Sequence, residues 1–454
     1  MLKSRLCIAF FAFAVGCAPA QKPLTDYVNP MLGTATLWDS VDLGFKPTKR
    51  TWGAEVFPGS SLPNAMVQVS PVTKFHSGAG YQYEDSVIYG FTHTNKGHWN
   101  LCHIPLLPVT GTPTPGDYCS PFSHERESAA PGYYQVFLDR YGVDAQLSST
   151  LRCAFHKYTY PAGAAPAVLA DLQRSNEHVR AWDIRKEGDN VFAGWQQTGE
   201  KMYFYAVANR PVTRIEPVVE GDREVRIVRF GEGDGALELR IGFSFVSEKN
   251  ARENLEAEML GKSFAEVRSE ATATWNDLLG RIRVEGGTER EKGLFYSSLY
   301  RSFLWPALRS DVNGEFTDVD GKVINPGFRY YTGPSYWDDY RNKLILLGML
   351  APDVAADVIS SDVDKGEKRG GFMPTFFHGD HASAFVAGTY LRGNRGFDVN
   401  RAYNLVLRNA TVQGPSRPWL DEYVAKGYIS EMDVENPVTW TVCKAAVTKT
   451  LEYS

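Results

Sequence analysis

The chain contains little cysteine: only six of its 454 residues. Two of the six lie before residue 21, and the others are Cys102, Cys119, Cys153 and Cys443. None of these four has the C-x-x-C spacing of a zinc-binding motif, so the sequence does not predict a zinc site. Two alternatives stay open for the thiols: a disulfide between Cys102 and Cys119 in an oxidising compartment, or buried free cysteines.

The chain also lacks an excess of positive charge. Its 48 lysines and arginines are outnumbered by 53 aspartates and glutamates, which gives a net charge of -5. A nucleic-acid partner would need a basic face, so we expect none. Aromatic residues make up 13% of the chain, a share that suits sugar recognition and equally an ordinary β-rich core.

The apolar run at the N-terminus is too short to span a bilayer. Residues 1–21 (MLKSRLCIAFFAFAVGCAPAQ) carry two early positive charges, this short run, and an A-x-A site at Ala18 and Ala20. These features predict a secretory signal peptide, residues 1–20, and export to the periplasm, the cell surface or the medium. Residues 14–17 also resemble a bacterial lipobox, so a lipid anchor at Cys17 is the open alternative.

From residue 21 to about 247 the pattern predicts strands. Short runs rich in β-branched and aromatic residues are mostly bounded by glycine, proline or asparagine, and no long helical period interrupts them. The clearest runs are residues 133–138, 157–160, 168–171, 202–207 and 238–243. Strands at this spacing predict a large antiparallel β-sandwich as the N-terminal domain.

The pattern then becomes helical. Residues 248–288 are charged and rich in Ala and Glu, with apolar residues at helical spacing, which predicts a helical linker. From 289 to 454, helical stretches alternate with loops; the clearest are residues 293–305, 338–349, 382–391 and 400–410. Paired helices with long loops predict an (α/α)6 barrel. Because the countable helices fall short of twelve, we expect 289–454 to form a partial barrel.

Two regions crowd aromatic and polar groups into short stretches, as binding of a polar ring such as a sugar requires. The first comprises residues 56–71 and the following residues 80–94, and the second is residues 335–341 (SYWDDYR). In the second, Asp338 can accept hydrogen bonds from vicinal hydroxyls, Arg341 can donate them, and Trp337 offers a stacking face. The alternative is a helix N-terminus favoured by acidic residues, with Asp338 as its cap.

These regions resemble the signature blocks of glycoside hydrolase family 92, the calcium-dependent, inverting exo-α-mannosidases. Residues 56–71 (VFPGSSLPNAMVQVSP) follow the family's T-F-P-G-A-x-L-P-F-G-M-V-Q-x-S-P, and residues 336–341 its L-W-D-T-Y-R. At least six blocks occur in order from residue 28 onward. The resemblance implies calcium as cofactor and mannose-containing glycans, N-glycans or mannans, as substrates. It also implies that His93, Trp337, Asp338 and Arg341 bind substrate.

Two further blocks of the resemblance, residues 124–134 and 152–161, predict structural roles. In them we expect Glu125 and Glu127 to be solvated and His156 to lie at the edge of the core. Residues 370–396 resemble the block that carries the family's glutamic general acid, but the loop is shorter here and holds no glutamate. Asp380 is therefore the candidate proton donor, and His381 a candidate sugar-binding residue; the metal ligands stay unassigned.

Residues 447–453 (VTKTLEY) resemble the block that leads into the general base of the family, and the sequence ends at Ser454. Inverting hydrolysis needs a base about 6.5–9.5 Å from the acid. We therefore expect weak or no hydrolysis by the chain as given. A non-catalytic mannose-binding protein is the main alternative, and a phosphorylase or polysaccharide lyase of similar architecture ranks below it.

Overall fold

The computed structural model describes residues 22–36, 44, 54–96, 99–375, 379–415, 417 and 419–428. The expected signal peptide, the lipobox cysteine Cys17 and the block at 447–453 lie outside these residues, as does His378 beside the candidate acid. For residues 95, 96 and 99 only the backbone is described.

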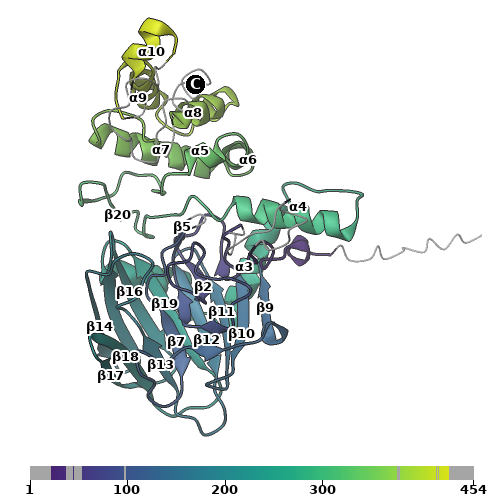
Figure 1. The fold of residues 1–454 in the computed structure, drawn as a ribbon, viewed down its shortest axis with the longest axis vertical. Coiled ribbons are helices and arrows are strands. Elements are labelled where there is room, and N and C mark those ends of the chain that lie inside the picture. Colours follow the sequence, from purple (N-terminus) through teal and green to yellow (C-terminus); the bar gives the residue numbers. More distant parts are fainter. Residues whose placement is uncertain are drawn as a thin grey trace, which may run out of the picture.

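Two antiparallel sheets form the N-terminal part of the chain (Figure 1). The seven-stranded sheet has the order β1 (Ser60–Ser61), β2 (Gln68–Val72), β4 (Gly90–Thr92), β7 (Leu106–Val109), β13 (Ala167–Ala170), β18 (Arg223–Phe230) and β17 (Val212–Glu220). The eight-stranded sheet has the order β14 (Ala181–Gly188), β15 (Val191–Gln197), β16 (Lys201–Ala208), β19 (Leu237–Ser244), β12 (Cys153–Thr159), β11 (Val143–Ser149), β10 (Tyr133–Leu138) and β9 (Glu127–Ala130).

Alternating burial explains why these strands form a sandwich. Along β16 the even positions Met202, Phe204 and Ala206 are fully buried, whereas the odd positions between them are partly exposed. One face of the strand therefore packs into the core between the sheets, as period-two patterning requires. Shorter pairs are β3 (Val87–Ile88) with β8 (Ser120–Pro121), β5 (Asn95–Lys96) with β6 (Trp99–Asn100), and β20 (Phe316–Thr317) with β21 (Val323–Ile324).

Three helices follow the last strand: α2 (Glu248–Glu258), α3 (Phe264–Leu279) and α4 (Glu289–Ser302). Ser263 and Thr288 cap α3 and α4 with complete capping boxes, which fixes where these helices begin. A buried apolar cluster packs α2 and α3 onto the outer face of the eight-stranded sheet; it contains Tyr133, Cys153, Phe155, Leu255, Met259, Phe264 and Val267. The residues expected to form a linker thus cover one face of the sandwich.

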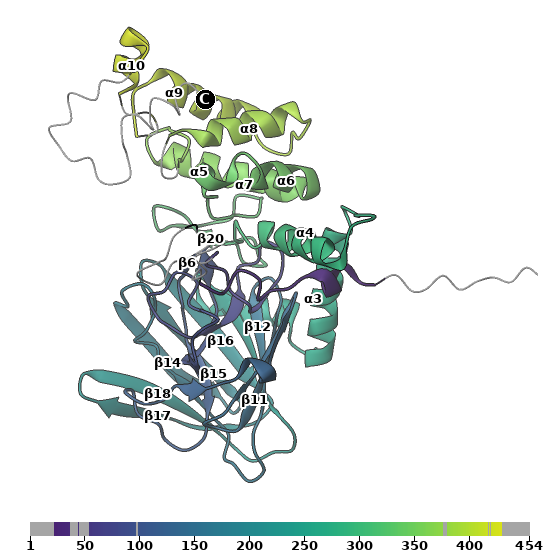
Figure 2. The same cartoon turned by 45° about the vertical axis from the view of Figure 1, so that its right-hand side comes forward.

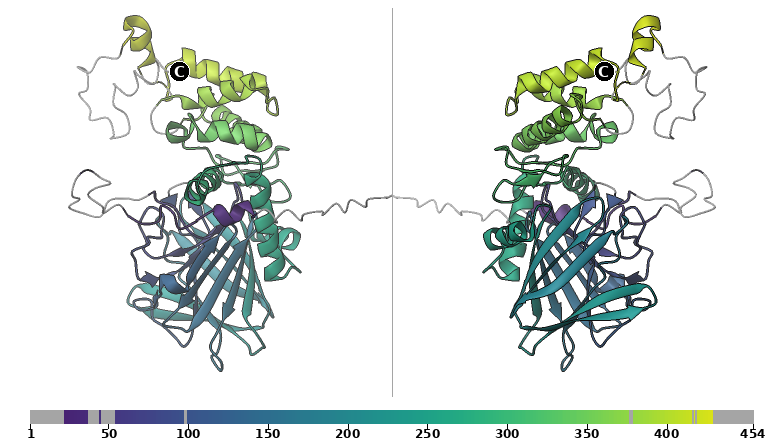
Figure 3. Two further views of the ribbon diagram at one scale, coloured as in Figure 1. Left: turned by 90° about the vertical axis from the view of Figure 1, so that its right-hand side faces the viewer. Right: turned by 90° about the vertical axis from the view of Figure 1, so that its left-hand side faces the viewer.

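The remaining helices lie beyond one end of the sandwich (Figures 2 and 3). They are α5 (Tyr336–Asp339), α6 (Lys343–Leu350), α7 (Pro352–Lys368), α8 (His381–Leu391), α9 (Val399–Thr411) and α10 (Leu420–Lys426). The structure confirms the expected fold class, an antiparallel β-sandwich followed by a helical part. Residues 338–349, expected as one helix, are instead divided between α5 and α6. The helix α7 was not predicted from the sequence pattern.

Within the described residues, no single helix is both long enough and apolar enough to cross a membrane. The bent pair formed by α6 and α7 passes that test only when the two helices are taken together.

Candidate functional site

Three aromatic rings from α5 and α8 meet at the candidate sugar site. The Tyr340 ring, directly after α5, stacks on His381 at the start of α8, with centroids 4.0 Å apart and an interplanar angle of 9°. The Trp337 ring lies 5.5 Å from the same imidazole, tilted by 55°. His381 is buried, whereas Trp337 is partly exposed. The structure therefore brings two of the expected binding residues together and adds Tyr340, which the sequence reasoning missed.

Adjacent carboxylates at α5 point into different surroundings. Asp338 is exposed and accepts a hydrogen bond from Ser335 Oγ at 2.5 Å. Asp339 is buried, 3.2 Å from Lys343 Nζ, and burial raises the pKa of this carboxyl. The N-cap residue of α5 is Ser335, so the alternative interpretation of Asp338 as the cap is wrong. Asp338 is left as a solvent-facing acceptor, which suits a sugar hydroxyl.

Arg341, which is exposed and follows Tyr340, lies beside the same rings. Its Nε donates to Tyr340 Oη at 2.7 Å, and its guanidinium carbon lies 4.9 Å from the centre of that ring. The tyrosine thereby fixes the guanidinium, while the side chain remains exposed. Trp337, Asp338 and Arg341 together offer a ring face, an acceptor and a donor, the three contacts that a pyranose uses. Tyr340 stands within the same motif, one residue before Arg341. Its place in the motif is the feature of the sequence that could have indicated its role.

A buried ion pair in α7 supports α5. Tyr336 Oη donates to the carboxylate of Asp362 on α7, and Lys365 Nζ lies 2.9 Å from the same carboxylate. Burial, followed by the charge of Asp362, holds the pKa of Tyr336 well above its usual value. These contacts fix the backbone that carries Trp337 and Asp338. The sequence did not predict this role of Asp362, because α7 was not predicted and the residue is 26 positions away from Tyr336.

The candidate acid Asp380 has a different environment from that of a proton donor. Its carboxylate is fully buried and accepts a hydrogen bond from Ser383 Oγ at 2.5 Å, capping α8. Asn409 Nδ2 and Arg417 Nη2 each donate to it at 3.1 Å. Donors thus reach both oxygens of the carboxylate, and the donor Arg417 is cationic, so the carboxylate is held in place. These contacts favour a role in positioning α8 and His381.

His93 lies in the sandwich core rather than at the candidate sugar site, which disagrees with the substrate-binding role expected for it. The side chain has 0% exposure in the sandwich core. Its Nδ1 faces the carbonyl oxygen of Ile104 at 2.9 Å, and its Nε2 lies 3.0 Å from Nε2 of His156. Both ring nitrogens are therefore used inside the protein, and no surface remains for a sugar. His156, expected at the core edge, is also fully buried.

Glu127 corrects a second expectation, since its side chain is only 1% exposed and is not solvated. It accepts hydrogen bonds from Tyr134 Oη at 2.5 Å and from Tyr81 Oη at 3.0 Å, and His124 Nδ1 lies 2.6 Å away. Three side chains thus satisfy one buried carboxylate, and one of them, Tyr81, is 46 residues away in sequence. Glu125 is exposed, as expected.

No metal centre emerges from the described part of the chain, where no group of three or more His, Cys, Asp or Glu side chains could hold an ion. These residues by themselves therefore do not fit a calcium site. Cys102, Cys119 and Cys153 are free thiols, so the disulfide alternative is wrong.

Comparison with known proteins identifies two family domains in the chain. The glycosyl hydrolase family 92 N-terminal domain matches residues 27–254, and the catalytic domain of the same family matches residues 250–454. An uncharacterised secreted glycosidase from Arthroderma benhamiae is 24% identical over 489 residues, covering 94% of this chain and 58% of that protein. The chain thus spans a little over half the length of this relative.

Solved structures show the same fold. A family 92 α-mannosidase from Bacteroides thetaiotaomicron superposes with a TM-score of 0.80 at 25% identity, over 89% of this chain and 58% of that one. Its complex with mannoimidazole gives 0.81 at 25% identity, over 90% and 58%. An inverting mannosidase of the family from the same bacterium gives 0.79 at 24% identity, over 91% and 59%.

Proposed function

The chain belongs to glycosyl hydrolase family 92, and from this premise we propose that it is an exo-α-mannosidase-type glycoside hydrolase. The proposed substrates are N-glycans or mannans, from which it removes terminal α-mannose. The solved family 92 mannosidases and the mannoimidazole complex of one of them support this choice of sugar.

The group formed by Trp337, Asp338 and Arg341 is the observation that carries the proposal. It offers an exposed carboxylate, a guanidinium fixed by Tyr340, and an indole beside the stacked pair of Tyr340 and His381. Vicinal hydroxyls bind carboxylate and guanidinium together, and the apolar face of the sugar packs on aromatic rings. We therefore place the terminal mannose here.

The proposed reaction is hydrolysis with inversion. A water molecule attacks the anomeric carbon as the bond to the leaving oxygen breaks, one carboxyl protonates that oxygen, and a second removes a proton from the water. We propose calcium as a cofactor on the strength of the family alone, and no step is assigned to it. Trp337 and the Tyr340–His381 pair would orient the ring, and Asp338 and Arg341 would hold its hydroxyls.

A non-catalytic mannose-binding protein is the second candidate. The geometry of Asp380 favours it, because this carboxylate is occupied by Ser383, Asn409 and Arg417. The test combines calorimetry with methyl α-mannoside and an assay of mannose release from α-mannobioses, with calcium and then with chelator. Binding with chelator-sensitive release supports the hydrolase, binding without release supports the second candidate, and absence of binding contradicts both.

We further propose that the protein is exported, because residues 1–21 have the features of a signal peptide and the fungal relative is described as secreted. N-terminal sequencing of the exported protein distinguishes the two forms of processing. A start at Gln21 indicates simple cleavage, and a blocked N-terminus at Cys17 indicates lipidation. A cytoplasmic protein that still begins at Met1 would contradict the proposal.

A further inference from the structure

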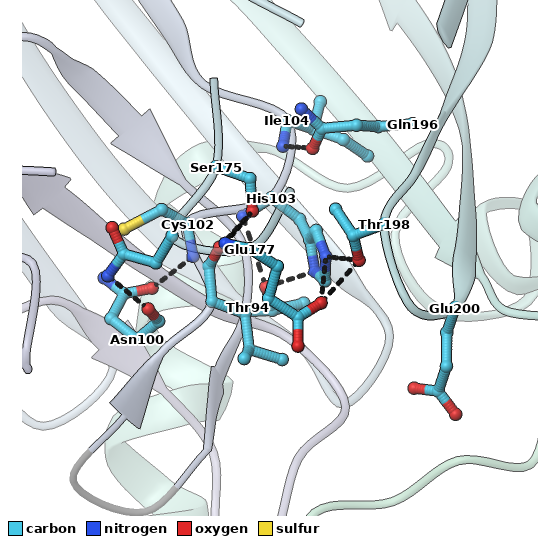
Figure 4. A network of polar contacts seen from close by, with 12 residues as sticks. Thr94, Asn100, Cys102, His103, Ile104, Ser175, Glu177, Gln196, Thr198 and Glu200 are labelled. Carbon is cyan, nitrogen blue, oxygen red and sulfur yellow. Dashed lines mark hydrogen bonds and ion pairs between the residues drawn. The ribbon is translucent and has the colours of Figure 1, made fainter. Parts of the chain in front are cut away.

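A chain of four side chains in the sandwich ends on the carboxylate of Glu177 (Figure 4). Thr94 Oγ1 lies 2.8 Å from Nδ1 of His103, whose Nε2 lies 2.9 Å from Thr198 Oγ1. Thr198 Oγ1 in turn lies 2.6 Å from Glu177 Oε2. The first three side chains are buried, and the fourth is 43% exposed. A buried network therefore ends on a carboxylate at the surface.

The hydrogen bonds of this network run in one direction. A carboxylate only accepts, so the Thr198 hydroxyl donates to Glu177 and its oxygen accepts from His103 Nε2–H. Nδ1 of His103 then accepts from the hydroxyl of Thr94. This arrangement requires a neutral imidazole, and burial lowers the pKa of His103 to about 4. No ion pair therefore forms across the 3.8 Å between His103 and Glu177.

The backbone on both sides of His103 is strained. Cys102 and Ile104 have φ values of 54° and 53°, in the left-handed region that side chains other than glycine rarely occupy. Ile104 is β-branched, which makes this conformation especially unfavourable; Gln196 Oε1 holds its N–H at 2.8 Å. Strain of this kind persists where the surroundings enforce it, and it gathers at functional sites. Here it directs the imidazole of His103 toward Thr198.

The loop that carries Glu177 is fixed by a buried serine and a partly buried asparagine. Ser175 Oγ donates to the Leu101 carbonyl at 2.6 Å and accepts from the backbone N–H of Glu177 at 3.2 Å. Asn176 Nδ2 donates to the Asn100 carbonyl at 2.6 Å. The position of the carboxylate is thus set before any ligand arrives, as in a preorganised binding group.

This network lies at the end of the sandwich that faces the helices. Glu200, next to it in Figure 4, pairs with Arg309 at 2.8 Å, and the positive charge of Arg309 contributes to the lowered pKa of His103. The backbone N–H of Arg309 donates to the Tyr330 carbonyl at 2.7 Å, five residues before Ser335. The β5–β6 hairpin, which begins directly after Thr94, lies near β20 below α5 (Figures 1 and 2).

Among the described residues, Glu177 has no charged partner. Within the described residues, the nitrogen nearest its carboxylate in ion-pairing range belongs to the neutral His103. Glu200, by contrast, is neutralised by Arg309. One oxygen of Glu177 accepts from Thr198, which leaves the other side of a rigid, half-exposed carboxylate facing solvent. Such a group is suited to accept hydrogen bonds from the hydroxyls of a polyol.

We propose that Glu177 is a substrate-binding residue of the sandwich, which accepts hydroxyls of the sugar unit next to the terminal mannose. This inference rests on the proposed function, in which Trp337, Asp338 and Arg341 hold the terminal unit. Two groups on separate domains then contact successive sugars. Thr198 and His103 are positioning residues that act through Glu177.

The test is calorimetry on the full chain, with α-mannobiose and with methyl α-mannoside. Glu177→Gln should weaken mannobiose binding about tenfold or more, since a hydrogen bond to a charged acceptor is lost, and leave methyl α-mannoside binding unchanged. Thr198→Val should weaken mannobiose binding in the same selective way. Glu200→Gln is the matched control and should change neither affinity.

An unchanged mannobiose affinity in Glu177→Gln overturns the inference, and so does an equal loss for both ligands, which would place Glu177 at the terminal sugar. In both cases the wild-type protein still binds α-mannosides, so the proposed function stands. If the wild-type protein binds neither ligand, the proposed function fails and this inference fails with it. Melting temperatures of the variants identify any loss of binding that comes from unfolding.

Discussion

Arg417 donates a hydrogen bond to the buried carboxylate of Asp380 over 3.1 Å, although 37 residues separate them in sequence. Arg417 is itself 8% exposed, so the pair is shielded from water. Asp380 also caps α8 through Ser383 and accepts from Asn409 on α9. One carboxylate therefore joins the segment after α9 to the helix that carries His381.

Asp380→Asn is expected to destabilise the helical part. The substitution leaves the guanidinium of Arg417 buried without its charge partner, at a cost of about 3–5 kcal/mol in the free energy of unfolding. Urea unfolding of variant and wild type measures the difference, with Asp338→Asn as an exposed control that should change it little. A variant with unchanged stability and lost mannose release would instead identify Asp380 as the acid.

Asp338→Ala should remove sugar binding without harming the fold. The side chain is exposed and accepts a hydrogen bond from Ser335 Oγ, so little packing is lost. The affinity for methyl α-mannoside should fall by about 10- to 100-fold, the effect of a lost charge-assisted hydrogen bond. Calorimetry and a melting curve measure the two quantities.

Asp339→Asn is the matched control for that prediction, because Asp339 is buried against Lys343. It should lower the free energy of unfolding by about 1–3 kcal/mol. A protein in which Asp338→Ala unfolds and Asp339→Asn does not would reverse the roles assigned to the two carboxylates.

Arg301→Ala should release the N-terminal segment from α4. Arg301 Nη1 donates to the Phe57 carbonyl at 2.9 Å, and Nη2 donates to the carbonyls of Pro30 and Leu32 at 2.5 and 3.1 Å. Loss of these bonds from a charged donor should lower the free energy of unfolding by about 2–4 kcal/mol. Arg301→Lys should restore little, because one ammonium cannot span three carbonyls. Faster limited proteolysis within residues 22–36 checks the effect, and unchanged cleavage in Arg301→Ala would contradict it.

The strands and helices whose formation depends on the pattern of neighbouring residues could be predicted from the sequence. Residues 133–138, 202–207 and 238–243 alternate or are rich in β-branched and aromatic residues, and they lie within β10, β16 and β19. The helices at 382–391 and 400–410 were located to within one residue at each end. The expected helix at 338–349 failed because Asn342, with φ of -137°, interrupts it and caps α6.

The environment of single side chains was not predictable, because it depends on partners far away in sequence. Nothing near Glu127 in sequence shows that Tyr81 will donate to it from 46 residues away. His93 stands in a motif that resembles a sugar-binding family, yet its partner is His156, 63 residues further along. Type and spacing of residues identified the region, and only the packed structure decided which side chains face outward.

Three buried histidines should make the protein sensitive to mild acid. Burial lowers the pKa of His93 to about 3 and of His103 to about 4, and holds the pKa of His156 well below its usual value. The hydrogen bonds agree with neutral rings: His93 Nδ1–H donates to the Ile104 carbonyl, so its Nε2 accepts from His156 Nε2–H. A second proton on His93 would place two N–H groups against each other.

The direction of this pH dependence follows from proton binding in the folded and unfolded states. In the unfolded chain these histidines titrate near pH 6.5, whereas the folded protein does not protonate them until much lower pH. Stability is therefore complete above about pH 7 and decreases as the pH falls from about 7 toward 4, by up to about 1.4 kcal/mol per pH unit for each histidine. Urea unfolding at pH 7, 6 and 5 measures the slope. His156→Gln removes one titrating group and should reduce the slope by about a third. A slope that is flat in the wild type, or unchanged in the variant, would show that the buried histidines do not determine the loss of stability in acid.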